Sequence, residues 1–467
     1  MKARDPRLEL IERYLDARAT AADAAQLEQE LRHDSELRAI YLEYANLDSA
    51  LEACCAHAPA PALTRRVERG PAWRTVFSVW RLASAAAAVA LLIAGVLLLR
   101  PAPPRVPPAS PVALEIIKTD GATGFSPGDR RVLSTLNIMS GAVSFRLDSG
   151  VVVEASAPTH LSFISPSELY VHRGKVTAEV TPQGKGFAFR TATARVVDLG
   201  TRFGVAVDRV DRTDVAVFDG QVRLYDPSEA TGAGSVLAEL TKGEGLRVSA
   251  SGKFRRLTTV ALNSSGAGWG NAGNRGIIRS VTDNVEDPAY YQYYGVIPGG
   301  LREGAMVYSN RRRIGWQPGG GSAFPAELVG SDLICPPHTY RHERDLRLTL
   351  RLEEPATVYV MLDTRRRIPA WLKKEFKDTG WHLRSGPWAE SGIVRGLRAD
   401  ARGEFFIEYT VWSRVMRKAG TVELGPPHIL GEGGAKAMFG IAVKPLRGPR
   451  LTLDRHATPP RHQSNDP

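Results

Sequence analysis

The most prominent apolar pattern in the chain is an uncharged run over residues 82–99, bounded by Arg81 and Arg100. As an α-helix this run would be about 27 Å long, which is close to the hydrocarbon thickness of a bilayer. A buried core helix is the alternative, but helices that are apolar all round at this length are uncommon in globular domains. The pattern predicts a transmembrane helix, and its distance from residue 1 indicates an internal anchor rather than a cleaved signal peptide.

Basic residues are concentrated before this run. Residues 65–81 contain five arginines, whereas residues 100–117 contain only Arg100 and Arg105. The more basic flank of a span remains in the cytoplasm, so we expect residues 1–80 inside and residues 100–467 outside. This predicts a single-pass protein of the bacterial inner (cytoplasmic) membrane, with its N-terminus in the cytoplasm, the lipid bilayer as a partner and most of the chain in the periplasm.

Before the apolar run, hydrophobic residues recur every three or four positions, as in short amphipathic helices. The third predicted helix carries a continuous apolar stripe, formed by Leu37, Ile40, Tyr41, Tyr44, Leu47 and Leu51. A domain this small is marginally stable alone, so a partner protein that covers part of the stripe is expected. A self-sufficient helical bundle is the alternative.

Beyond the run the apolar period changes from about 3.6 to two. Short alternating stretches such as Val215–Val217 are separated by turn signals such as Asp219-Gly220. This pattern predicts an all-β module. Later stretches, including Leu346–Leu352 and Val358–Leu362, alternate in the same way and predict an antiparallel β-sandwich.

The predicted fold class is therefore multidomain, with a small all-α N-terminal segment, one transmembrane helix and two all-β domains. The predicted segments are 1–63 (cytoplasmic helical domain), 64–81 (basic linker), 82–99 (transmembrane helix), 100–111 (proline-rich stalk), 112–257 (first β domain), 258–276 (Gly/Ser linker), 277–445 (β-sandwich) and 446–467 (disordered tail).

Composition narrows the choice of partners. The 467 residues carry a net charge of +11, and most of the excess lies beyond the predicted span, where no direct nucleic-acid partner is expected. An acidic polysaccharide would suit this charge, although scattered solvated charge is the simpler explanation. Cys54 and Cys55 are predicted on the opposite side of the membrane from Cys335, so no disulfide scaffold is expected.

The sequence offers little support for catalysis. No nucleophile elbow, P-loop or supported carboxylate pair is present, and His338 and His342 follow two prolines rather than standing in a metal-binding helix. The glycine-rich string at 268–273 lacks the strand and helix that a dinucleotide loop requires. We predict no catalytic residue, no metal ligand and no cofactor, and we do not expect an enzyme.

One stretch of the first β module is more specific. Residues 196–207 (VVDLGTRFGVAV) and 213–222 (TDVAVFDGQV) resemble the signature of the FecR domain, and residues 169–176 fit the same pattern. The signature positions are Asp198, Gly200, Thr201, Phe203 and Gly220. We interpret Gly200-Thr201 as a tight bend between strands and assign it no chemistry. The likeness covers about residues 112–250, and the domain could be a β-roll, a solenoid or a sandwich.

Members of the FecR family regulate extracytoplasmic-function sigma factors from the membrane. The resemblance implies that the N-terminal segment binds such a sigma factor in the cytoplasm and that the β domains sense an envelope signal. Parts of residues 14–38 also resemble the anti-sigma segment of multidomain relatives from environmental bacteria. The apolar stripe at 37–51 is therefore the expected sigma-factor-binding face.

A second resemblance concerns the C-terminal module. Residues 359–380 and 420–425 are similar to motifs of exported jelly-roll modules that resemble galactose-binding-like domains. One possible role for Trp371, Trp381 and Trp388 is to stack on the sugar rings of a ligand, and the other is to fill the core. The alternative function is therefore a membrane-tethered carbohydrate-binding or envelope structural protein without sigma-factor regulation, with an envelope protein or polysaccharide as its partner.

Overall fold

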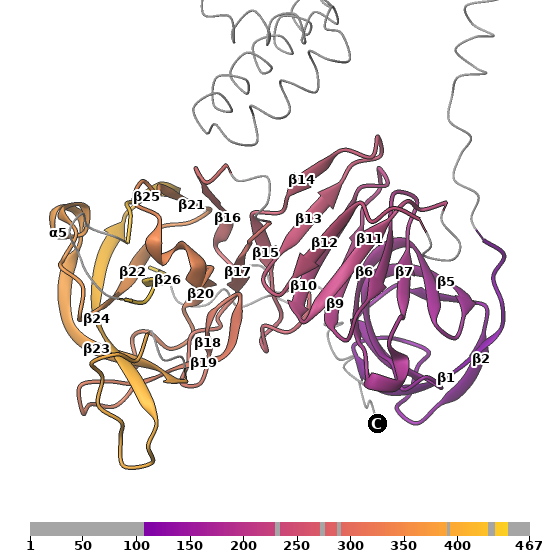
Figure 1. Ribbon diagram of the computed structural model, residues 1–467, viewed down its shortest axis with the longest axis horizontal. Coiled ribbons are helices and arrows are strands. Elements are labelled where there is room, and N and C mark those ends of the chain that lie inside the picture. Colours follow the sequence, from indigo (N-terminus) through magenta and orange to yellow (C-terminus); the bar gives the residue numbers. More distant parts are fainter. Residues whose placement is uncertain are drawn as a thin grey trace, which may run out of the picture. The chain divides into compact units, whose positions relative to one another are not determined.

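The computed structural model of the protein describes residues 107–228, 234–270, 276–286, 291–389, 393–427 and 435–446. Its first part is a 14-stranded sheet, drawn in purple and magenta in Figure 1. The strands are β1 (Val112–Asp120), β2 (Arg130–Leu133), β3 (Thr135–Ile138), β4 (Ala142–Leu147), β5 (Val152–Ser165), β6 (Glu168–Glu179), β7 (Ala188–Arg190), β8 (Arg195–Asp198), β9 (Arg202–Val207), β10 (Thr213–Asp219), β11 (Gln221–Tyr225), β12 (Ala238–Thr241), β13 (Gly245–Val248) and β14 (Phe254–Arg256). A short 3-10 helix, η1 (Pro182–Gly184), precedes β7.

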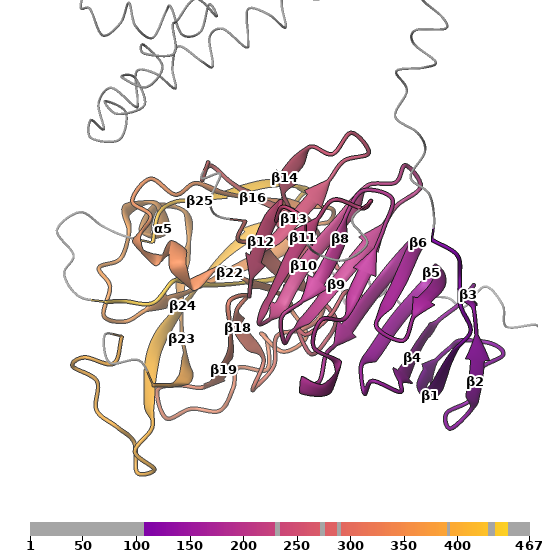
Figure 2. The same ribbon diagram turned by 45° about the vertical axis from the view of Figure 1, so that its right-hand side comes forward.

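The long strand β6 is the branch point of this sheet. Its first residues pair in parallel with β7, whereas Gly174–Glu179 pair with β9 in antiparallel fashion. Strand β5 behaves similarly, because it pairs with β4 before a register shift and with β3 after it. Figure 2 shows one of the two resulting paths, in which β14, β13, β10, β9, β6, β5 and β4 follow one another.

The branched sheet surrounds one hydrophobic core. Its fully buried aromatic residues are Phe145, Phe163, Phe187, Phe189 and Phe203. Burying an aromatic side chain of this size contributes roughly 1.5–3 kcal/mol to folding. The alternating apolar positions of the strands supply the rest of this core, because successive side chains of a strand point to opposite faces.

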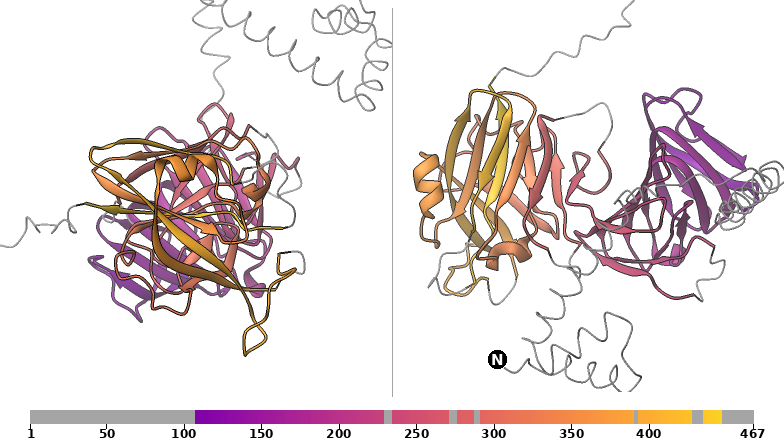
Figure 3. Two further views of the ribbon diagram at one scale, coloured as in Figure 1. Left: turned by 90° about the vertical axis from the view of Figure 1, so that its left-hand side faces the viewer. Right: turned by 90° about the horizontal axis from the view of Figure 1, so that it is seen from above.

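The second part combines a nine-stranded sheet with a three-stranded sheet, and its strands run from pink through orange to yellow in Figure 3. The larger sheet contains β15 (Thr259–Ala261), β17 (Tyr294–Ile297), β18 (Met306–Tyr308), β19 (Arg311–Pro318), β20 (Asp332–Cys335), β22 (Ala356–Asp363), β23 (Lys377–Trp388), β24 (Phe405–Met416) and β26 (Gly440–Pro445). The smaller one contains β16 (Ile278–Asp283), β21 (Leu348–Leu352) and β25 (Gly420–Leu424). The 3-10 helix η2 (His338–His342) and the helix α5 (Ala370–Glu375) complete the module.

Residues 258–270, which the sequence suggested as a linker, are built into this module. They contain β15, which pairs in parallel with β17, and they bury Val260, Leu262 and Trp269. The Trp269 ring stands edge-on to Phe218 of β10, with 5.9 Å between the ring centroids. The segment therefore carries apolar side chains that pack against the first sheet.

The predicted fold class, which combined an all-α segment and a transmembrane helix with two all-β domains, is wrong: the structure is almost entirely β, and neither of those helical parts is among the described residues. The one α-helix of the described residues, α5, has six residues. No helix among the described residues is long and apolar enough to cross a membrane. The segments for which an all-α domain and a transmembrane helix were predicted, 1–63 and 82–99, lie outside the described residues.

The contact between β9 and Trp269 gives a test of this packing. A Cβ atom at Gly204 would lie 2.2 Å from Trp269 Nε1 and 2.9 Å from Phe218 Cε2. Gly204→Ala should therefore lower the free energy of unfolding by roughly 1–3 kcal/mol. Trp269→Ala removes the closest of these contacts and leaves only the one with Phe218, so the double variant should lose less stability than the two single variants combined. Urea unfolding of the full chain measures this coupling, and strictly additive losses would contradict it.

Candidate functional site

The signature residues form a compact turn between β8 and β9. Asp198 ends β8, and its Oδ2 accepts a hydrogen bond from the backbone N–H of Gly200 at 2.8 Å. Its Oδ1 accepts a hydrogen bond from the Thr201 hydroxyl. Gly200 has φ +110°, a conformation that residues with a Cβ rarely adopt. The structure thus brings Asp198, Gly200 and Thr201 together in one bend.

The remaining two signature residues support this turn. Phe203 is fully buried and packs its ring 5.3 Å from that of Phe189 in the core. Gly220 has φ +80°, and a Cβ there would lie 2.6 Å from the carbonyl oxygen of Gly200. Asp198, Gly200, Thr201 and Gly220 therefore meet at this turn, while Phe203 lies in the core at the start of β9.

Burial raises the pKa of Asp198 to about 6, although the backbone N–H of Gly200 acts in the opposite direction. The side chain has no exposed surface, and water cannot solvate its charged form. The turn is thus held by a carboxyl group whose protonation state changes near neutral pH. Among the described residues, no group of His, Cys, Asp or Glu side chains could hold a metal ion.

The three tryptophans proposed for sugar stacking are placed differently. Trp388 is only 3% exposed and donates from Nε1 to Ser385 Oγ at 3.0 Å. Trp371 is half-buried, donates to the carbonyl oxygen of Pro426 at 3.2 Å and packs edge-on against Phe376. Trp381 is also half-buried, with its ring 6.1 Å from Tyr359. None of these three indole rings contacts another, so the structure does not bring them together.

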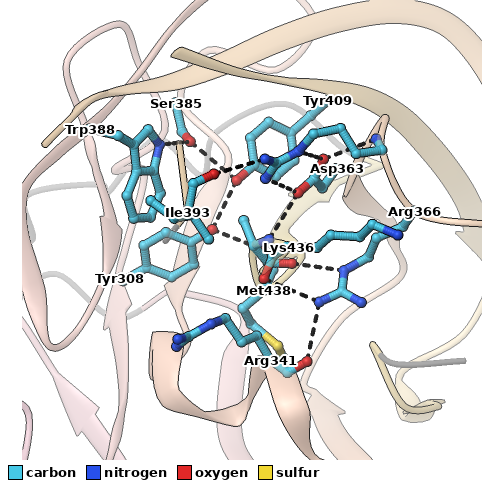
Figure 4. Close-up of polar contacts among 12 residues, drawn as sticks. Tyr308, Arg341, Asp363, Arg366, Ser385, Trp388, Ile393, Tyr409, Lys436 and Met438 are labelled. Atoms are coloured by element: carbon cyan, nitrogen blue, oxygen red, sulfur yellow. Dashed lines mark hydrogen bonds and ion pairs between the residues drawn. The ribbon is translucent and has the colours of Figure 1, made fainter. Parts of the chain in front are cut away.

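Trp388 belongs to a buried polar cluster that the sequence did not reveal (Figure 4). The Tyr308 and Tyr409 hydroxyl groups lie 2.9 Å apart, and Tyr308 also donates to the carbonyl oxygen of Met438 at 2.8 Å. Ser385 donates to Tyr409 at 3.1 Å. Burial raises the pKa of both tyrosines well above the ordinary value, so they remain neutral donors and acceptors.

Arginines complete the cluster. Arg365 forms a bidentate ion pair with the fully buried carboxylate of Asp363, with distances of 2.9 Å and 2.7 Å. Arg366 instead donates to backbone carbonyl oxygens, including that of Ala437 at 2.9 Å. The charged run after the apolar strand β22 was the available signal, but nothing local indicates that these side chains turn inward.

His338 lies at the edge of this cluster, with its ring 4.8 Å from Tyr308 and 5.1 Å from Trp388. Burial, together with the charge of Arg341, lowers the pKa of His338 to about 2. A neutral imidazole in such surroundings fills space and does not serve as an acid at neutral pH. The cluster therefore organises the core of the second module, and we assign it no reaction.

The predicted sigma-factor-binding face, residues 37–51, lies outside the described residues.

Comparison with known proteins identifies the first module. Residues 135–223 match the family model described as FecR protein. The match spans the signature turn and its flanking strands, so the FecR recognition made from the sequence is confirmed. No curated protein sequence matches the chain.

Solved structures give weaker matches. Two structures of a candidate anti-sigma factor from Parabacteroides distasonis ATCC 8503 are 26% identical, cover 26% of this chain and have TM-scores of 0.22. The chain spans 58% and 57% of those two chains. A β-glucuronidase from glycoside hydrolase family 2 is 11% identical with a TM-score of 0.28, covering 73% of this chain and 39% of that one. Similarities at this level carry no functional argument.

The buried carboxyl group gives a pH-dependent prediction. The pKa of Asp198 rises from 3.8 to about 6 on folding, so its stabilising contribution is present below about pH 4 and is lost as the pH rises through about 6. Asp198→Asn removes this titration. We expect the melting temperature of the wild type, relative to that of the variant, to fall between about pH 4 and pH 7. Parallel profiles would contradict the assignment.

Asp226→Asn is a matched control for this experiment. The pKa of Asp226 is lowered by hydrogen bonds from Ser228, so its small contribution is present at higher pH and lost on acidification. The variant should therefore show a weak effect of opposite sign in the same melting series.

Burial of Trp388 predicts a structural role. Trp388→Ala should lower the free energy of unfolding by about 3–5 kcal/mol, because it leaves a cavity and removes the donor to Ser385. Trp381→Ala, at a half-buried position, should cost clearly less. Urea unfolding measures both, and an unchanged stability of Trp388→Ala would show that the indole is not part of the core.

Proposed function

Because residues 135–223 carry a FecR domain, we propose that this chain is a regulator that binds an extracytoplasmic-function sigma factor in the cytoplasm and senses an envelope signal through its β-rich part. The family match is the observation that carries this proposal. It falls on a turn whose buried carboxyl group and glycines serve the fold rather than a reaction. A regulatory role agrees with that arrangement.

The proposed binding face for the sigma factor is the apolar stripe at residues 37–51. Six apolar side chains at helical spacing form a surface that would be covered by a folded partner. Binding there would withhold the sigma factor from RNA polymerase. The interaction would be relieved when the β-rich part responds to its signal.

A location at the bacterial inner membrane is part of the same proposal. It rests on the apolar run at 82–99 and on the excess of arginine before it. The N-terminal residues would then face the cytoplasm, where sigma factors act, and residues 107–446 would face the envelope.

Co-purification of the tagged full chain with candidate sigma factors tests the proposal. Leu37→Asp, Ile40→Asp and Tyr44→Asp, combined, should reduce recovery of the sigma factor by about tenfold or more, since a few apolar anchors dominate such interfaces. Transcription from the sigma factor's promoters should rise in the same cells. Met139→Asp, at a position 84% exposed in the FecR domain, is the matched control and should leave both readouts unchanged.

Two results would count against the proposal. One is full retention of the sigma factor by the triple variant, which would exclude the stripe as the binding face. The other is an unchanged set of transcripts after deletion of the whole chain, which would exclude sigma-factor regulation. In that case the alternative of a carbohydrate-binding or structural envelope protein would be the one to pursue.

A further inference from the structure

Strands β5, β6, β9, β10 and β13 lie side by side in the FecR-domain sheet (Figure 2). Residues of these strands line a basic pocket. Its volume is about 290 Å³. One row of directly paired residues crosses it, namely Ser156, Lys175, Ala206, Asp214 and Arg247. Side chains of directly paired residues in neighbouring strands lie on the same face of the sheet. These five side chains therefore project from one face.

The residue in the middle of this row has a small side chain. Ala206 stands between Lys175 and Asp214, and its methyl group leaves a hollow that longer neighbours surround. Ala157 and Pro158 of β5 extend the lining with further apolar surface. The pocket thus has a small apolar floor and a charged rim.

Two arginine–aspartate pairs are built into the rim. Arg247 places Nε 2.6 Å from Asp214 Oδ1 and Nη2 2.7 Å from Asp214 Oδ2. Arg212 places Nε 2.7 Å from Asp208 Oδ2. Each aspartate orients its arginine and offsets one positive charge.

The rim nevertheless remains basic. Arg173, Lys175, Arg212 and Arg247 line the pocket together with only two acidic residues, Asp208 and Asp214. Arg173 has no ion-pair partner in the described part of the chain. Lys175 donates from Nζ to the carbonyl oxygen of Gly270 at 3.3 Å, which places its ammonium group beside Gly270.

We propose that this pocket binds a small organic anion, with a carboxylate or phosphate group held by Arg173 and Lys175 and a compact apolar body resting on Ala206. Guanidinium and ammonium groups form charge-assisted hydrogen bonds with both kinds of anion. The volume suits a small molecule rather than a polymer chain. The existence of this site does not depend on the proposed regulation.

Isothermal titration of the full chain with benzoate, phenyl phosphate and the neutral analogue benzyl alcohol tests this inference. We expect one saturable site for an anionic probe, weakened by added salt, and no such site for benzyl alcohol. Preference for benzoate or for phenyl phosphate supports the proposal and identifies the anionic group. Absence of binding by both anions at millimolar concentration, or equal binding of the neutral analogue, would overturn it.

Two variants test separately whether ligand binding depends on the basic side chains and on the hollow above Ala206. Arg173→Gln combined with Lys175→Gln removes the proposed anion contacts, and Ala206→Leu fills the hollow while keeping every charge. The charge variant should weaken binding by about tenfold or more, since loss of a charge-assisted contact has an effect of that order. Ala206→Leu should weaken binding to a similar extent, because the larger side chain occupies the space proposed for the apolar body of the ligand. Arg130→Gln, at a side chain 83% exposed on β2, is the matched control and should bind as the wild type does.

Melting curves of each variant show whether it is folded. Unchanged affinity in both the charge variant and the Ala206→Leu variant, with both folded, would overturn the assignment. Because the two variants act by different means, failure of one to fold leaves the other to decide the question.

Discussion

The close pairing of β5 with β6 is the constraint on which the FecR domain depends. At Gly174 of β6 a Cβ atom would lie 2.2 Å from Thr159 Oγ1 and 2.6 Å from the carbonyl oxygen of Pro158. The residue also has φ +109°, so glycine meets both the steric and the conformational requirement there. From Gly174 onward, β6 pairs with β9, which begins directly after the signature turn. The pairing of β5 with β6 therefore helps to determine where this turn lies.

The sequence was informative where structure is local. Alternation at Val215 and Val217 falls on β10, and the structure has a turn at Gly200-Thr201 between β8 and β9. The branch at β6 could not be predicted, because the strand pairs with β5, β7 and β9, and its alternating pattern does not specify which distant strands it meets. Trp269 illustrates the same limit, since its contact with Gly204 joins residues far apart in a stretch whose composition resembles a linker.

The net charge of the sequence likewise predicted only part of how the charged side chains are arranged. The net charge of +11 suggests scattered solvated side chains, yet several arginines are held in specific pairs. Arg256 forms a bidentate contact of 2.8 Å with the buried carboxylate of Asp283, and Arg365 does so with Asp363. Buried ion pairs of this kind are weak evidence for stability, and what the structure shows directly is that they hold neighbouring groups in defined orientations. The Tyr294 hydroxyl, which donates to Asp283 at 2.7 Å, is one group positioned in this way.

The boundary near residue 257, where the first β domain was predicted to end, affects how the protein can be divided into fragments. Backbone groups of the first sheet are satisfied from beyond it, since the Gly245 N–H donates to the Tyr291 carbonyl and the Tyr293 hydroxyl donates to that of Val217. A fragment that stops where the composition changes would leave Phe218 without Trp269 and several polar groups without partners. Such a piece would expose apolar surface that the longer chain covers, and exposed apolar surface of this kind promotes self-association.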